Sequence, residues 1–194
     1  MPTPRPPGRP RSERARRAVL AATLSLAAEE GTAGLHMEAI AKRAGVSKET
    51  LYRWWRSKTE VVLEALAERS DRTIPLPDTG SLGGDLRAFL RATVDAADPT
   101  TVRLLHAVAA EAAADQHVAQ IVRDRFLVTR RAALGELLER AVDRGEVTRE
   151  YAAMAIDLVY GSLWYRLIFD VGPLDHGWAD AVAVAIAPGQ HFVV

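Results

Sequence analysis

The stretch AIAKRAGVSKETLYRWW, residues 39–55, decides the fold of this chain. A short helix from about Met37 to Ala44 is expected to stop at Gly45, because glycine enters a left-handed turn at little cost. Ser47 is a good N-cap for a second short helix over residues 48–55. Two such helices around a glycine turn, the second rich in polar and basic residues, predict a helix-turn-helix, whose second helix enters the major groove of DNA.

The apolar side chains of Ile40, Val46 and Leu51 would form the core of this motif. An ordinary pair of packed helices with a charged outer face is the alternative interpretation of the same pattern. The distribution of charge favours the helix-turn-helix. The whole chain is neutral, with 25 Lys and Arg against 25 Asp and Glu, but residues 1–58 carry twelve basic and five acidic side chains. A head of charge +7 on a body of charge −7 predicts that the head binds a polyanion.

Composition and motifs argue against several classes of site. The chain has no cysteine, which excludes disulfides, zinc-thiolate sites and thiol catalysis and makes a reducing cytoplasm the expected location. The five histidines lack the i, i+4 spacing of a helical metal site, and no Walker A, G-x-G-x-x-G, H-E-x-x-H or nucleophile-elbow pattern occurs. We therefore expect no enzyme activity, no cofactor and no metal. Residues 181–194 are the longest run without a charged side chain and are too short to cross a bilayer, so no transmembrane helix or membrane partner is expected.

The sequence of the rest of the chain also predicts helices. Alanine supplies 34 of the 194 residues and no stretch alternates with period two, which predicts an all-α protein. The expected helices cover about residues 12–30, 58–72, 82–97, 98–114, 116–144, 148–171 and 174–187. The segment 73–84 holds two prolines and three glycines and is the expected boundary between domains. This divides the chain into a flexible basic arm (1–12), a helix-turn-helix domain (13–72) and a helical effector-binding and dimerisation domain (73–194).

Two features of the N-terminal region have competing interpretations. Five prolines among residues 1–12 predict a mobile arm, in which Arg9 and Arg11 belong to a Gly-Arg-Pro pattern similar to an AT-hook that lies in the DNA minor groove. A disordered basic tail that attracts phosphates without sequence preference is the alternative. The uncharged run 18–28 behind several arginines has the outline of a signal peptide. The helical spacing of its apolar residues favours an amphipathic first helix instead.

Residues 14–66 resemble the N-terminal DNA-binding domain of the TetR family of bacterial transcriptional regulators. The resemblance rests on an Ala- and Leu-rich helix ending in Glu-Glu-Gly and on the run AIAKRAGVSKETLYRWWRSKTEVV, whereas the rest of the chain matches only in length and helical order. It implies that Lys48, Thr50 and Arg53 face the DNA groove, that Tyr52 and Trp54 face the sugar-phosphate backbone, and that Lys58 binds a phosphate. A cation at a helix N-terminus agrees with that last role, because free N–H groups there already favour an anion.

The chain departs from the family pattern at two places. The second helix usually begins with Thr or Ser, whereas Leu35-His36 stands here, and histidine is a weak cap. The pair Trp54-Trp55 replaces a more usual His-Phe. We expect Trp55 to fill the core position of the phenylalanine, while Trp54 keeps an indole N–H donor.

The resemblance also implies a homodimer held by the last two long helices. Residues 154–169 are apolar almost all round, so this helix must be covered on several sides. The interface candidates are Leu163, Leu167, Trp178 and Val182, and packing within one protomer is the alternative for each. Two heads about one helical turn apart, ~34 Å, would read a palindromic operator.

Polar and aromatic residues scattered through the apolar helices of the body are candidates for a ligand pocket. They are Phe89, Arg103, His106, His117, Phe126, Met154 and Tyr165, and a hydrogen-bonded structural role is the alternative for each. The resulting hypothesis is a cytoplasmic, homodimeric regulator, a repressor that binds palindromic DNA and is released by an unidentified small-molecule effector. The competing hypothesis is a helical small-molecule-binding protein or enzyme without sequence-specific DNA binding.

Overall fold

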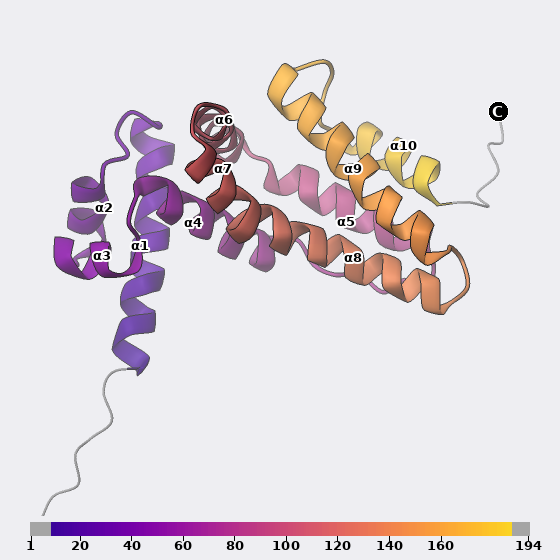
Figure 1. Cartoon of the computed structure of the whole chain (residues 1–194), viewed down its shortest axis with the longest axis horizontal. Coiled ribbons are helices and arrows are strands. Elements are labelled where there is room, and N and C mark those ends of the chain that lie inside the picture. The colour runs from indigo at the N-terminus through magenta and orange to yellow at the C-terminus, as the bar shows by residue number, and fades with distance from the viewer. Residues whose placement is uncertain (1–8, 188–194) are drawn as a thin grey trace, which may run out of the picture. The chain divides into compact units, whose positions relative to one another are not determined.

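The structure, a computed structural model, describes residues 9–187, with side chains from residue 13 onward. All the elements assigned in this range are helical, ten α-helices and one π-helical turn, and no strand occurs among them (Figure 1). The all-α prediction is therefore confirmed. The chain forms two compact units that divide between Ala65 and Leu66, and each unit is described by itself below.

Unit 1 contains α1 (Arg9–Glu30), α2 (Met37–Ala44), α3 (Lys48–Trp54) and the first half of α4 (Lys58–Thr73). Helix α1 begins at Arg9, three residues before the expected start. Pro10 does not prevent this, because an N–H in the first turn of a helix has no partner within the helix. The backbone of Arg9 and Arg11 is thus part of α1, but their side chains are not among the described ones. Residues 1–8 of the expected arm lie outside the described residues.

The core of unit 1 is closed by Trp55, which is 1% exposed. Its indole N–H donates a hydrogen bond of 2.6 Å to the Glu64 carboxylate, which also accepts one of 2.5 Å from Arg16. These two bonds join the end of α3 to α4 and α1. Because a buried indole N–H needs a partner, Glu64 is what allows a tryptophan to occupy this position. The prediction that Trp55 fills the core is confirmed.

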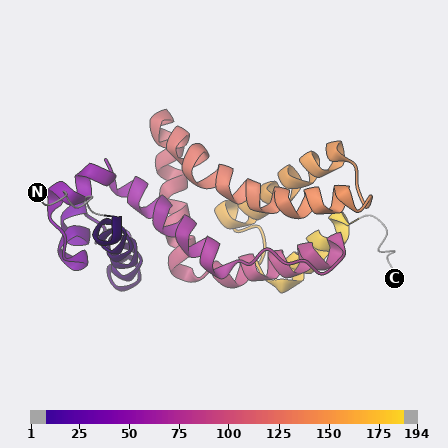
Figure 2. The ribbon, with the colours of Figure 1, turned by 90° about the horizontal axis from the view of Figure 1, so that it is seen from below.

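Unit 2 contains the second half of α4 and six further α-helices. They are α5 (Leu82–Ala96), α6 (Pro99–Ala114), α7 (Gln116–Val122), α8 (Val128–Asp143), α9 (Arg149–Phe169) and α10 (His176–Ile186). The helix expected over 116–144 is interrupted by one π-helical turn, η1 (Arg123–Leu127). Helix α5 packs on α10 and on α8, and α9 packs on α8 and α6 (Figure 2).

Side-chain caps set several helix starts in unit 2. Asp98 accepts a hydrogen bond of 2.8 Å from the Thr101 N–H, with Pro99 in the first turn of α6. Thr148 caps α9 by accepting from the Tyr151 N–H. The segment 73–84, where we expect the domain boundary, mostly connects α4 to α5, whereas the two compact units divide within α4.

Helix α9 is the one helix of the described residues that is long and apolar enough to cross a membrane, by length and composition alone. The expectation that the chain has no such helix rests only on stretches without a charged residue. Helix α9 carries Asp157 and Arg166 within its apolar sequence. Helix α9 buries Ala155, Val159 and Leu163 against its neighbours. The core helix of a soluble protein has the same length and composition, so this property is weak evidence for a membrane.

Candidate nucleic-acid interface and effector cavity

The turn between α2 and α3 has the geometry that the sequence predicts. Gly45 adopts φ 68° and ψ 32°, its N–H bonds the Lys42 carbonyl at 3.3 Å, and the Val46 N–H bonds the Ala41 carbonyl at 3.1 Å. This pair of bonds is a Schellman motif, which ends a helix and redirects the chain. Ser47 then caps α3 by accepting from the Thr50 N–H at 3.2 Å. The start of α2 has no such cap, since the His36 side chain makes no capping hydrogen bond.

The predicted DNA-contacting side chains lie on and beside α3, most of them exposed. Lys48, Tyr52, Arg53 and Lys58 are exposed, and Lys58 is the first residue of α4. Thr50 is half-buried, with its hydroxyl 3.1 Å from that of Ser47. Exposed cations on a short helix after a tight turn form a surface that can meet a phosphate backbone and base edges.

Two contacts hold side chains of this surface in place. The Lys48 ammonium pairs with the Glu38 carboxylate at 3.1 Å, which contributes to a lowered pKa of Glu38, after the larger effect of a backbone N–H bond. The Arg53 guanidinium lies over the Trp54 ring, 5.7 Å from its centroid. Trp54 is half-buried and meets Trp55 edge to face at 5.4 Å, so it supports Arg53 rather than projecting freely.

A pair that sequence patterns do not reveal braces α2 against α1. The Arg43 guanidinium makes two hydrogen bonds of 2.8 Å to the Glu29 carboxylate. The bonds from Arg43, and a further one from Ser25, lower the pKa of Glu29 to about 2. The partners are fourteen residues apart on different helices, so no helical spacing could have paired them. The contact orients α2, the helix that precedes the predicted recognition helix.

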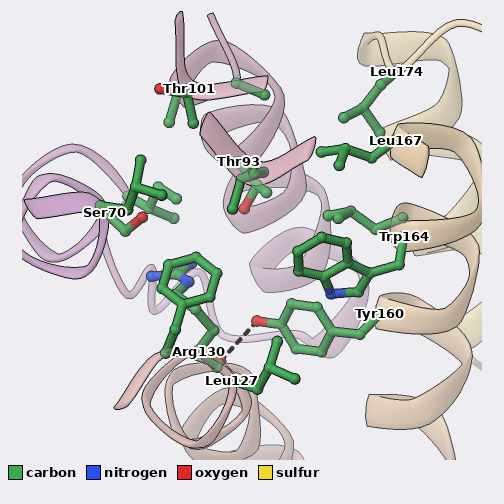
Figure 3. A pocket seen from close by; sticks show the side chains of 16 residues that line it. Ser70, Thr93, Thr101, Leu127, Arg130, Tyr160, Trp164, Leu167 and Leu174 are labelled. Atoms are coloured by element: carbon green, nitrogen blue, oxygen red, sulfur yellow. Dashed lines mark hydrogen bonds between the residues drawn. The ribbon is translucent and has the colours of Figure 1, made fainter. Parts of the chain in front are cut away.

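Unit 2 contains a cavity of about 70 Å³ with a mostly apolar lining (Figure 3). Helix α4 contributes Leu66 and Ser70 to its wall, and Ile74 follows directly. Arg130 from α8 and Tyr160 from α9 supply polar groups. A largely apolar pocket with a few convergent polar groups is the usual form of a small-molecule site.

The structure separates the seven pocket candidates. Phe126 lines the cavity, whereas Phe89 is 1% exposed, lies beneath the Arg130 guanidinium and is not itself part of the lining. The other five are exposed and are not part of the cavity lining: Arg103, His106, His117, Met154 and Tyr165. His106 bonds the Leu167 carbonyl, which is the structural role expected of a lone histidine. These five are on outward-facing sides of their helices, which only the packing of the body determines.

The sequence analysis did not identify Arg130, Tyr160 or the α4 residues as part of the cavity. Arg130 is one of many arginines in the body, and its sequence context gives no sign that it is 6% exposed. Ser70 and Leu66 belong to a helix that we assigned to the DNA-binding domain. The spacing of apolar residues in α4 was the available signal, because it predicts a buried face along the whole helix.

Helix α9 carries an exposed apolar face formed by Met154, Leu158, Tyr165 and Phe169. These side chains are 50, 51, 58 and 68% exposed. Their spacing places them within an arc of about 60° on the helix. Gly161 lies at the edge of this arc, and a Cβ atom there would meet no other atom within 4 Å. The face is apolar and uncovered in one protomer.

The four interface candidates named from the sequence lie elsewhere. Leu163, Leu167 and Trp178 are 7, 6 and 5% exposed and belong to the core of unit 2, so a partner could cover little more of them. Leu163 and Leu167 also line the cavity. Val182 on α10 is half-buried. Leu163, Leu167 and Trp178 therefore follow the alternative interpretation, which is packing within the protomer.

Two family models match this chain. Residues 19–65 match the model "Bacterial regulatory proteins, tetR family", and residues 76–186 match "Tetracyclin repressor-like, C-terminal domain". The first match contains the helix-turn-helix, and the second covers most of the helices around the cavity. The resemblance over residues 14–66 therefore extends to the body.

Individual relatives show the same likeness. The chain is 33% identical to an uncharacterized HTH-type transcriptional regulator of Bacillus subtilis, YdeS, over 83% of this chain and 82% of that protein. It is 30% identical to the DNA-binding transcriptional repressor TetR of Mycobacteroides abscessus, over 92% and 97%. The crystal structure of the TetR family transcription regulator SCO0332 superposes with a TM-score of 0.82 at 31% identity, over 91% of this chain and 98% of that one.

Proposed function

The chain belongs to the TetR family of transcriptional regulators, which are not enzymes, and we propose that it is a cytoplasmic, homodimeric repressor that binds palindromic operator DNA and is released by a small molecule. TetR-family regulators bind DNA and typically act as dimers with small-molecule effectors. The observation that carries the proposal is the α2–Gly45–α3 motif, with Lys48, Tyr52 and Arg53 exposed on its second helix.

The DNA-binding surface combines groove and backbone contacts. Lys48, Thr50 and Arg53 are proposed to reach into the major groove, and Tyr52, Trp54 and Lys58 to contact the backbone. Lys58 is favoured for a phosphate because it stands at the first turn of α4, where the positive end of the helix dipole also attracts an anion. Arg9 and Arg11 would add contacts from the start of α1.

Dimer formation is proposed to use the exposed apolar face of α9. One short recognition helix makes few base contacts, so two heads are needed to read an operator. Met154, Leu158, Tyr165 and Phe169 provide an apolar surface on a single helix, and uncovered apolar patches of this kind mark interaction sites. Gly161 lies about halfway along this face, and its lack of a side chain lets a partner helix approach closely there.

Release by an effector is proposed to act through α4. Leu66 and Ser70 of this helix line the cavity, and Arg69 pairs with Asp98 at the start of α6. Lys58 is the first residue of the same helix. A ligand that favours a different position of the helix would therefore move a proposed phosphate contact, and a differential affinity of about 5.5 kcal/mol shifts a population from 1:99 to 99:1.

Selection of bound fragments from random duplex DNA tests this function with the full-length protein. We expect a palindrome to be enriched, with affinity that falls steeply as the salt concentration rises. Repeating the binding assay with small-molecule extracts should identify fractions that release the DNA. Recovery of no common sequence, or binding that does not respond to salt, would reject the proposal.

A further inference from the structure

The cavity of unit 2 contains a buried cation without a counter-charge. Arg130 is 6% exposed, and its Nη2 atom has no hydrogen-bond partner among the described residues. Its guanidinium lies 5.5 Å from the centroid of the Phe89 ring, and no carboxylate of residues 13–187 pairs with it. Buried charges in proteins are usually paired, because removing an ion from water without a partner is costly.

The groups around Arg130 do not neutralise it. The Tyr160 hydroxyl donates a hydrogen bond of 2.7 Å to the Arg130 carbonyl oxygen. Burial raises the pKa of Tyr160, although the charge of Arg130 acts in the opposite direction, so the phenol stays protonated and neutral. Figure 3 shows Ser70, Arg130 and Tyr160 reaching the cavity from α4, α8 and α9. One positive charge and neutral hydroxyls therefore stand in an apolar wall.

We infer that the cavity binds an apolar molecule with a single carboxylate, and that this carboxylate pairs with Arg130. A planar guanidinium is suited to a carboxylate because it donates parallel hydrogen bonds to both oxygens. The apolar body of the acid would lie against Leu66, Phe126 and Trp164. This inference rests on the proposed function in one respect only, that the bound acid is the effector.

The size of the cavity limits the acid. A volume of about 70 Å³ has room for about five to seven water molecules, at 10–15 Å³ each. A cavity that holds one benzene molecule is about 150 Å³, so a short aliphatic acid is the matching size. Propionate and butyrate are therefore suitable probes, and propionamide and butyramide are neutral counterparts of nearly the same shape.

The test compares the full-length protein with Arg130→Met and Arg130→Lys by calorimetry and thermal unfolding. In the unaltered protein the carboxylates should bind at least about tenfold more tightly than the amides. A hydrogen bond to a charged group contributes enough binding free energy for a difference of this size. Arg130→Met should remove this preference, and Arg130→Lys should keep part of it. Without ligand, Arg130→Met should have an equal or higher Tm, because it removes an unpaired buried charge.

The outcomes separate this inference from the proposed function. If no carboxylate of the C2–C6 aliphatic series binds more tightly than its amide, or if Arg130→Met binds both acids as well as the unaltered protein, the inference is wrong. A marked fall in Tm for Arg130→Met without ligand also contradicts it, because a structural role would then explain the residue. Binding of the selected palindrome without ligand should be the same in all three proteins. Failure of the unaltered protein to bind DNA would instead reject the proposed function.

Discussion

Single residues on and near α3 divide into those that shape the helix-turn-helix and those free to meet DNA. Glu29 and Arg43 are bonded to each other, and Trp55 is buried and bonded to Glu64. Lys58 is exposed and forms no ion pair in the part of the chain that the structure describes. The first group supports the shape of the motif, and Lys58 is available for a phosphate.

Replacing Lys58 with alanine should weaken binding to every DNA sequence alike. Removing one phosphate interaction reduces the steepness of log K against log salt by about 0.9, so a dimer, which has two such lysines, should show a reduction of about 1.8. Binding titrations on the selected operator at several salt concentrations measure the slope. Arg131→Ala is the matched control, because Arg131 is an exposed arginine of α8 paired with Asp157 and should leave the slope unchanged. An unaltered slope for Lys58→Ala would remove this residue from the set that binds phosphates.

The bond between Arg43 and Glu29 should stabilise the protein in a defined pH range. Because the pKa of Glu29 falls from 4.5 to about 2 on folding, the contribution is complete above about pH 4.5 and is lost as the pH falls towards 2. Urea unfolding should therefore show a larger difference between the unaltered protein and Glu29→Gln at about pH 6 than at about pH 3. In an Arg43→Gln background the same substitution should show much less pH dependence. A difference that stays constant with pH would contradict the assignment.

Among the helices, α9 has two apolar faces, one buried and one exposed. One face packs on α8 and α6 through Val159 and Leu163, and the other carries Leu158 and Tyr165 outward. A helix that is apolar all round shows little periodicity, so its sequence does not indicate which face is the inner one. The neighbouring helices make that assignment.

A charge on the outer face of α9 should separate the protomers. Leu158→Glu places a carboxylate in the proposed interface, where it would be desolvated without a partner, and we expect a monomer by sedimentation or light scattering. Affinity for the palindrome should fall with it. Val128→Glu on α8, also an exposed apolar position at 57%, should leave the protein dimeric. A dimer that survives Leu158→Glu, with an unchanged helical CD spectrum, would place the interface on another face.

At the scale of the whole molecule, one continuous helix belongs to both compact units, the one with the proposed DNA-binding surface and the one with the cavity. Helix α4 spans the division between the two compact units at Ala65 and Leu66. Its first half carries Lys58 and its second half lines the cavity. This continuity supports the proposal that a ligand in the body affects DNA binding in the head.

Two heads in one dimer should require a fixed spacing of half-sites. Inserting about five base pairs between the halves of the selected palindrome turns one half-site by about half a turn, to the opposite side of the duplex. Affinity should then fall about 10²-fold or more, towards that of a single half-site, because the second head no longer adds avidity. Inserting about ten base pairs returns both half-sites to the same side of the duplex but leaves them about one helical turn further apart. The affinity for this site therefore shows how far the two heads can separate. Equal affinity for all spacings would indicate that the heads bind independently.

The helix-turn-helix could be predicted from the amino-acid sequence alone, because the signals that set its turn and its second helix are local. Gly45 permits the left-handed turn, and Ser47 caps α3 by accepting from the N–H of Thr50, three residues later. Trp55 follows Leu51 by four residues. Each of these signals acts within one or two turns of the chain, where spacing and side-chain type are sufficient. The same is true of the caps at Asp98 and Thr148.

The cavity and the exposed face of α9, in contrast, depend on how the helices pack together. Arg130, Tyr160 and Ser70 lie on three helices and meet only because those helices are neighbours in space. Met154 and Tyr165 were expected in the pocket and are exposed instead, whereas Leu163 was expected at an interface and is buried. In an Ala- and Leu-rich helix many residues are interchangeable in hydrophobicity, so the inward face depends on which neighbours cover it. That choice is made by contacts between residues far apart in the chain.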